Sequence, residues 1–148
     1  DLNLAESVIK PACAEFKNEA SEKGLEMICK NEVSENDLVK ADQYTITQSI
    51  INLVDNAIKY TDNGHVSVRY FKENGHHIIE VADTGVGISE EFFPQLFEKF
   101  SQEDQGYARK FEGNGLGLAL VKKYCDINNA SISYESIKGK GTKFSITI

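Results

Sequence analysis

The chain has 148 residues, of which 41% are hydrophobic and 26% charged, proportions that are ordinary for a single globular domain. Its formal net charge of −7 argues against a general nucleic-acid-binding surface, because such a surface requires clustered Lys and Arg. No run approaches the roughly 18 consecutive apolar residues of a membrane span, and no signal-peptide pattern opens the chain. We therefore expect one soluble domain, residues 1–148, without membrane contact of its own.

The cysteines predict neither a disulfide framework nor a zinc site. Cys13, Cys29 and Cys125 are odd in number, widely spaced and not in a CxxC arrangement. A reducing cytoplasm is the compartment that fits this usage. We expect a cytoplasmic domain, whose parent protein is either membrane-anchored or soluble.

The first forty residues are predicted to form a helix and two short strands. Apolar residues recur at helical spacing over residues 1–23, and Pro11 either kinks this helix or resets its start. Gly24 follows as a helix C-cap. Residues 25–30, LEMICK, and residues 37–42, DLVKAD, are typical of strands.

Residues 43–60 predict a second helix that has one polar face. At about 100° per residue, its apolar residues fill one arc and four polar residues fall in the other. These four are Gln48, Asn52, Asn56 and Lys59. Asparagine is a mediocre helix former, and its amide oxygen suits Mg²⁺ that shares phosphate oxygens with a nucleotide. The polar arc is therefore either a metal and phosphate site or an ordinary solvated helix face.

The remaining elements alternate between strands and helices. Residues 65–72 and 76–83 predict two strands joined by a tight hairpin at Asn74-Gly75. An aromatic stripe in residues 90–100 is most simply core packing, with a loop anchor as the alternative. Residues 101–114 are polar and without period, which predicts a long surface loop.

A further helix opens at GNGLGL, and two final strands are expected at residues 130–136 and 142–148. Helices and strands alternate, yet most neighbouring strands form hairpins. The pattern therefore predicts an α+β fold, a two-layer sandwich in which helices cover one face of a mixed sheet.

Three glycine motifs follow the asparagine-bearing helix in a fixed order. They are DTGVGI (residues 83–88), GNGLGL (residues 113–118) and GKGTKFSI (residues 139–146). Each alone is weak evidence, since strand-to-helix turns need Gly in proteins of every function. Together with NLVDNAIKYT they resemble the N, G1, G2 and G3 boxes of the GHKL superfamily, and specifically the ATP-binding catalytic domain of two-component sensor histidine kinases. EEFFPQLFEKF resembles the F box of that family.

The resemblance implies the Bergerat fold, with ATP and Mg²⁺ as cofactors, and it assigns roles to single residues. Asn56 would hold Mg²⁺ with Asn52 assisting, and Lys59 would contact phosphate. Asp83 would accept a hydrogen bond from the adenine amine and repel guanine, which carries an oxygen at that position. The alternative role of Asp83 is to cap a turn. Tyr60 would pack against the base, or be a half-buried core tyrosine.

The glycine boxes and the long loop receive roles in the same way. Gly85 and Gly87 would permit close approach of the ligand, and Thr142 would join a water network beside adenine. Residues 101–114 would form the ATP lid, in which Arg109 or Lys110 would stabilise charge during transfer. Free amides where the loop becomes a helix would bind phosphate oxygens. These phosphate-binding residues are Gly113, Gly115, Leu116 and Gly117.

One position favours a kinase over a hydrolase. ATPases of the superfamily carry a glutamate four residues before the metal-binding asparagine, whereas this chain has Asn52 there. ATP would thus be kept for an acceptor, a histidine on a helical hairpin of the same protein outside this chain, which would serve a downstream response regulator. His65, His76 and His77 are expected on the surface. The rival functions are a serine kinase or ATPase on this fold, and an ATP-binding module without transfer activity.

Overall fold

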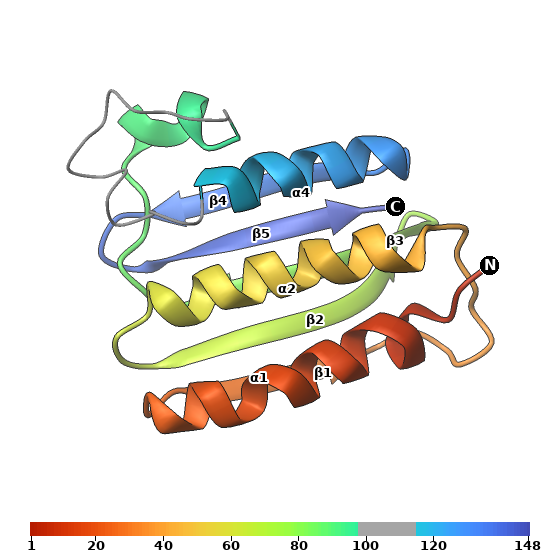
Figure 1. Cartoon of the computed structure of the whole chain (residues 1–148), viewed down its shortest axis with the longest axis horizontal. Coiled ribbons are helices and arrows are strands. Elements are labelled where there is room, and N and C mark those ends of the chain that lie inside the picture. The colour runs from red at the N-terminus through yellow and green to blue at the C-terminus, as the bar shows by residue number, and fades with distance from the viewer. Residues whose placement is uncertain (98–114) are drawn as a thin grey trace.

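The structure is a computed structural model that describes residues 1–97 and 115–148. A five-stranded sheet has the order β1-β2-β3-β5-β4 (Figure 1). β1 pairs with β2 in parallel, and all other neighbours are antiparallel. The strand bounds are β1 Glu26–Asn31, β2 His65–Glu73, β3 His76–Asp83, β4 Ser131–Ile137 and β5 Gly141–Thr147.

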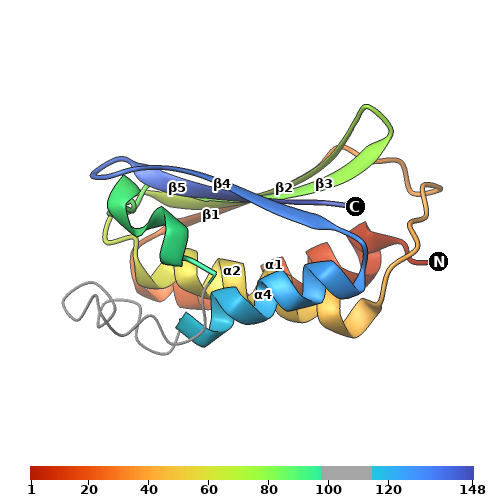
Figure 2. The same ribbon diagram turned by 90° about the horizontal axis from the view of Figure 1, so that it is seen from above.

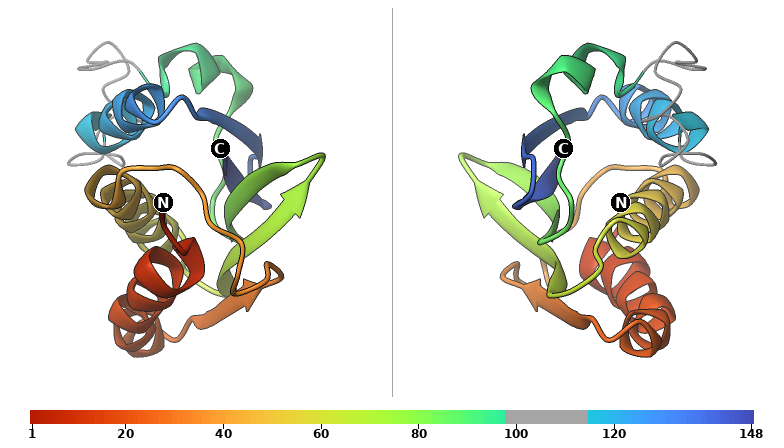
Figure 3. Two further views of the ribbon diagram at one scale, coloured as in Figure 1. Left: turned by 90° about the vertical axis from the view of Figure 1, so that its right-hand side faces the viewer. Right: turned by 90° about the vertical axis from the view of Figure 1, so that its left-hand side faces the viewer.

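The helices α1 (Lys10–Glu22), α2 (Gln43–Lys59) and α4 (Gly115–Ile127) cover one face of this sheet (Figure 2). Seen along the strands, the three helices lie side by side in one layer and the sheet forms the other (Figure 3). A short π-helical turn, η1 (Ala5–Ile9), precedes α1, and a 3-10 helix, η2 (Glu90–Gln95), follows β3. The predicted two-layer α+β sandwich with a mixed sheet is confirmed.

One prediction about the first forty residues is confirmed and one needs correction. The helix expected over residues 1–23 runs without a break from η1 into α1, and Pro11 lies where the π-helical turn changes to α-helix, as the predicted reset at this residue implies. The strand expected at residues 37–42 is wrong. Val39 makes only an isolated bridge to Leu2, with N···O distances of 2.7 and 2.9 Å.

Helix α2 starts at a side-chain cap that also ties it to α4. The Asp42 carboxylate accepts hydrogen bonds from the backbone N–H of Thr45 at 2.9 Å and from its hydroxyl at 2.8 Å, and these bonds hold the pKa of Asp42 below its usual value. Asn128, just beyond α4, accepts from the Asp42 N–H at 2.7 Å and donates to the Thr45 hydroxyl at 2.9 Å. The start of α2 is therefore fixed against the end of α4.

The inward faces of β2 and β3 make the centre of the core, and His77 belongs to it. His77 is 8% exposed, and its Nδ1 lies 2.6 Å from the hydroxyl of Tyr70. Its expected place on the surface is therefore wrong, because it shares the inward side of β3 with Ile79 and Val81. Burial lowers the pKa of His77 and raises the pKa of Tyr70 to about 12.

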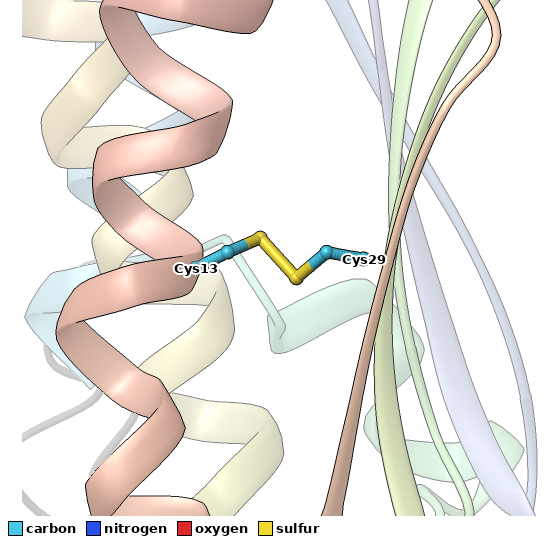
Figure 4. The surroundings of a disulfide bond; sticks show 2 residues. All are labelled: Cys13 and Cys29. Carbon is cyan, nitrogen blue, oxygen red and sulfur yellow. A yellow bond between two sulfur atoms is a disulfide. The ribbon is translucent and has the colours of Figure 1, made fainter.

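A disulfide joins Cys13 in α1 to Cys29 in β1, contrary to the expectation of unpaired thiols (Figure 4). The two Cα atoms lie 6.6 Å apart, although 16 positions separate the residues in the chain. Their pairing depends on how α1 packs over β1, which spacing alone does not reveal. Cys125 is buried, and burial raises the pKa of its thiol to about 11.

Candidate nucleotide-binding site

A pocket opens between the C-terminal half of α2 and the sheet. Its walls come from α2, β3, the loop after β3, α4 and β5, which meet at one end of the molecule (Figure 1). Five of the predicted site residues line it: Asn56, Tyr60, Asp83, Gly87 and Thr142. Segments that are far apart in the sequence thus converge as the sequence motifs predicted.

Helix α2 presents a polar side chain to this pocket that lacks a partner. Leu53, Asn56, Ala57 and Tyr60 line the pocket at the i, i+3, i+4, i+7 spacing of one helix face. Asn56 is 6% exposed, and its buried Nδ2 has no hydrogen-bond partner among the described residues. An unsatisfied buried polar atom costs roughly 1–3 kcal/mol. Because Nδ2 is a donor, a ligand atom that accepts a hydrogen bond from it would recover that cost.

Asp83 ends β3 and has one carboxylate oxygen fixed. Its Oδ1 accepts hydrogen bonds from the backbone N–H of Gly85 at 2.9 Å and of Thr142 at 3.3 Å. Within the described part of the chain, Oδ2 accepts none. Burial raises the pKa of Asp83, while the hydrogen bonds from Gly85 and Thr142 act in the opposite direction. The site therefore holds an oriented carboxyl group that can accept a hydrogen bond from a ligand.

The glycines of the DTGVGI segment are needed by the protein's own backbone. A Cβ on Gly85 would lie 2.2 Å from the carbonyl oxygen of Tyr60, and one on Gly87 would lie 2.2 Å from that of Ile137. Gly87 also has a φ of +69°, which favours glycine. These glycines were predicted to let a ligand approach the backbone closely. In the structure they let the end of α2 and the β4–β5 turn pack closely against the loop after β3. Gly87 lines the pocket, whereas Gly85 does not.

A hydroxyl pair connects the loop after β3 to the β4–β5 hairpin. The Ser136 hydroxyl oxygen accepts a hydrogen bond from the Ile88 N–H at 2.7 Å and lies 2.8 Å from the hydroxyl of Thr142. Thr142 in turn donates its N–H to Asp83. Ser136 was not among the predicted site residues. Its role comes from the register in which Ser136 faces Thr142 across the hairpin, which local sequence does not fix.

Other predicted residues lie near the pocket without lining it. Asn52 is half-buried, and its Cγ would lie 4.0 Å from a Cβ on Gly117 of α4. Lys59 is exposed and forms an ion pair with Asp55, with 2.9 Å between Nζ and Oδ2. Both side chains of this pair contact solvent.

The predicted lid falls outside the described residues. This applies to residues 101–114 and therefore to Arg109, Lys110 and Gly113. Gly115 and Leu116 are the first described residues of α4, so the helix predicted after this glycine motif is confirmed. The N-terminus of α4 lies at the same end of the molecule as the C-terminus of α2 (Figure 1). The positive end of the α4 dipole is thus available on the pocket side.

The described part of the aromatic stripe packs against the core, as its simplest interpretation predicted, whereas Phe100 lies outside the described residues. Phe93 and Phe97 pack against Tyr134 of β4 with ring centroids 5.0 and 5.7 Å apart, and Phe97 also contacts Phe144 at 6.3 Å. Leu96 is buried beside them. Phe144 lines the pocket as well, so this cluster supports the pocket wall.

Sequence reasoning missed the apolar lining of the pocket. Its residues could have been inferred from position, because Leu53 and Ala57 share a helix face with Asn56, and Val81 shares a strand face with Asp83. The additional apolar lining residues are Leu53, Ala57, Val81, Val86, Ile88, Leu118 and Phe144. A mainly apolar pocket that also holds a carboxyl group suits an aromatic heterocycle that carries an amine.

The chemistry of the donors limits which metal fits. Among residues 1–97 and 115–148, no group of three or more His, Cys, Asp or Glu side chains is placed to hold a metal ion. A single asparagine oxygen, by contrast, suits Mg²⁺ that keeps its waters and shares phosphate oxygens with a ligand.

The described helices include none that is long and apolar enough to cross a bilayer.

Comparison with known proteins identifies the family of this fold and site. Residues 41–148 match the family described as histidine kinase-, DNA gyrase B-, and HSP90-like ATPase. The chain is 35% identical over 153 aligned positions to the autoinducer 2 sensor kinase/phosphatase LuxQ of Vibrio harveyi, which covers 99% of this chain and 17% of that protein. It is 41% identical over 113 positions to the circadian input-output histidine kinase CikA of Synechococcus elongatus, covering 76% and 15%.

Solved structures agree with this assignment. The catalytic domain of histidine kinase ThkA superposes with a TM-score of 0.82 at 26% identity, covering 99% of this chain and 92% of that one. Full-length ShkA in complex with AMPPNP gives a TM-score of 0.82 at 27% identity, covering 97% and 29%. The chain thus spans less than a fifth of LuxQ and CikA but nearly all of a histidine kinase catalytic domain.

Proposed function

Because this chain belongs to the histidine kinase-, DNA gyrase B-, and HSP90-like ATPase family and has the fold of histidine kinase catalytic domains, we propose that it binds Mg²⁺-ATP and transfers the γ-phosphate to a histidine. The acceptor histidine would lie on a helical hairpin of the same protein, outside this chain. A response regulator would then receive the phosphate. The domain would act in the cytoplasm.

The proposal depends mainly on one observation: Asp83 and Asn56 line the same pocket, and each has a polar atom without a hydrogen-bond partner among the described residues. Asp83 Oδ1 is held by two backbone N–H groups while Oδ2 is left to accept, and Asn56 has a buried polar atom without a described partner. An adenine amine would satisfy Asp83, and Tyr60, which lines the same pocket, would pack against the base. Guanine would place an oxygen against the carboxylate.

The phosphates would extend from this pocket toward the start of α4. Free amides of Gly115, Leu116 and Gly117 would donate to them, supported by the positive end of the helix dipole. Mg²⁺ held by Asn56, with Asn52 assisting, would offset the charge on the phosphate oxygens. Lys59 would exchange Asp55 for phosphate at little cost, because an exposed ion pair contributes at most about 1 kcal/mol.

The residue at position 52 favours transfer over hydrolysis. Asn52 is an amide and has no basic group to take a proton from water, so ATP would persist until an acceptor arrives. The transfer step itself would rely on positioning and charge stabilisation, in which Arg109 or Lys110 of the 101–114 segment would take part.

The direct test is phosphotransfer in trans. The domain would be incubated with γ-labelled ATP, Mg²⁺ and the histidine hairpin of its parent protein, and label on the hairpin would be tested for stability in alkali and loss in acid. We expect alkali-stable, acid-labile label on the hairpin and none on the domain alone. An acid-stable product would indicate a serine kinase, and ATP turnover without acceptor would indicate an ATPase.

A further inference from the structure

The disulfide lies at the edge of the molecule, where one of its two residues is accessible. Cys29 is exposed on β1, an edge strand that pairs only with β2, whereas Cys13 on α1 is 9% exposed. Figure 4 shows the bond crossing between the helix layer and the sheet. Cys29 is thus the more solvent-exposed residue of the pair, and its Sγ is the atom that we expect a soluble dithiol to attack. In the cytoplasm we propose for this domain, disulfides are usually transient and sense redox state rather than serve as permanent staples.

The loop closed by this bond contains a residue that contacts the nucleotide-binding end of α2. Lys23, the C-cap residue of α1, lies between the two cysteines in the chain. Its Nζ donates hydrogen bonds to the carbonyl oxygens of Ile58 at 2.7 Å and of Lys59 at 3.0 Å. These carbonyls belong to the last turn of α2, where few backbone acceptors have helical partners.

The last turn of α2 forms a wall of the pocket. Tyr60 lines the pocket, and its carbonyl oxygen accepts the Val86 N–H at 3.0 Å from the loop that follows Asp83. The Thr61 N–H donates to the Ile58 carbonyl oxygen, which Lys23 also contacts. Lys23 therefore links the loop between the two cysteines to the residues that bound the proposed adenine site.

We propose that Cys13 and Cys29 form a reversible redox pair, and that oxidation of this pair strengthens nucleotide binding by holding Lys23 against the end of α2. Reduction breaks the bond that closes the loop between Cys13 and Cys29, so local opening of α1 and β1 becomes more frequent. The loop-closure model gives an upper limit of about a hundredfold for this change in the opening equilibrium. The nucleotide part rests on the proposed function, because it requires that the pocket binds ATP.

The exchange step is balanced with a dithiol as reductant. A thiolate of the dithiol attacks Sγ of Cys29, the Cys29–Cys13 bond breaks, and the Cys13 thiolate leaves and takes a proton. The second thiol of the dithiol then attacks the mixed disulfide and releases Cys29 as a thiol. Two electrons and two protons pass to the protein, and the reductant becomes a cyclic disulfide. Oxidation by a small-molecule disulfide is the reverse.

The test compares oxidised and dithiothreitol-reduced domain, with free thiols counted under denaturing conditions in each state. Calorimetric titration with Mg²⁺-ATP is expected to give an affinity about three- to tenfold weaker in the reduced state, since only the closed form binds fully. Hydrogen exchange at the amides of Tyr60 and Thr61 is expected to be faster after reduction. Cys13→Ser should behave like the reduced protein in both measurements and should not respond to dithiothreitol.

A second pair of variants separates Lys23 from the disulfide. Oxidised Lys23→Met should show the nucleotide affinity of the reduced protein, whereas Lys17→Met, an exposed lysine of the same helix, should not differ from the unmodified chain. Identical affinity and identical exchange in the two redox states, or failure of the two thiols to join and separate reversibly, would overturn the proposal. If neither state binds nucleotide, the proposed function fails, and the exchange rates of Tyr60 and Thr61 alone decide the redox inference.

Discussion

At the scale of single residues, the site is marked by two polar atoms that have no hydrogen-bond partner among the described residues. Asp83 has one oxygen bonded twice and the other without a bond from the described residues, and Asn56 has a buried nitrogen without a described partner. The buried Asn56 nitrogen lowers the stability of the free domain, and a ligand can pair with either atom. Substitutions at these two positions should therefore separate stability from binding, which ordinary core substitutions do not.

Asp83→Asn should weaken ATP binding while leaving the fold intact or more stable. Burial raises the pKa of Asp83, so ionisation of this group opposes folding, and a neutral amide removes that penalty. The amide nitrogen would, however, face the adenine amine with a donor, which should reduce affinity about 10- to 100-fold. Calorimetry and urea denaturation measure the two effects. A stable variant with unchanged ATP affinity would exclude Asp83 from base recognition.

Asn56→Ala should mainly remove the Mg²⁺-dependent part of ATP binding. The substitution deletes a buried polar atom without a described partner, so the free energy of unfolding should change by no more than about 1 kcal/mol. ATP affinity would be measured with Mg²⁺ and with a chelator. Asn18→Ala, at an exposed asparagine of α1, is the control and should change neither value. An equal loss of affinity with and without Mg²⁺ would contradict the metal role.

At the scale of elements, sequence periodicity predicted the pieces and their order well. The polar arc of α2, the hairpin at Asn74-Gly75 and the start of α4 appear where expected. What periodicity could not predict are contacts between elements, such as the bridge of Ser136 to Thr142 and the tie of Asn128 to Asp42. These depend on strand register and helix packing, and no local pattern encodes them.

Gly87→Ala should destabilise the domain by about 2–4 kcal/mol, because it adds both a positive-φ strain and a clash. Its φ is +69°, and a Cβ would lie 2.2 Å from the Ile137 carbonyl oxygen. Gly139→Ala is a matched control, since its φ is +84° but nothing lies within 4 Å of a Cβ there. That variant should lose only about 1 kcal/mol. Urea denaturation that gives equal losses would disprove the packing role of Gly87.

At the scale of the whole molecule, the chain is a layered fold whose two ends differ in chemistry. The candidate nucleotide pocket lies at the C-terminal end of α2, and the tie between Asp42 and Asn128 lies at its start. Family motifs predicted five residues that line the first end but not its apolar lining; the five are Asn56, Tyr60, Asp83, Gly87 and Thr142. The buried pair of Tyr70 and His77 was missed, because a histidine in a strand gives no sign of its face until the register is known.

His77 should make stability depend on pH. Burial lowers its pKa from 6.5, helped by Lys72 and opposed by Asp37, so the unfolded chain binds a proton more readily than the folded one. The free energy of unfolding should therefore decrease as pH falls through about 6.5 toward the lower folded-state pKa. In His77→Gln, which still offers an acceptor to Tyr70, the decrease between about pH 7 and 5.5 should be smaller. Equal slopes in urea titrations would contradict this.

The central claim is that this pocket recognises adenine through Asp83, and nucleotide selectivity tests it most directly. Calorimetric titration of the domain with Mg²⁺-ATP and with Mg²⁺-GTP compares ligands that differ in the base alone. Because GTP would leave the half-buried carboxylate facing an oxygen, we predict that ATP binds more tightly by roughly 10⁴-fold. Comparable affinities for the two nucleotides would contradict the account.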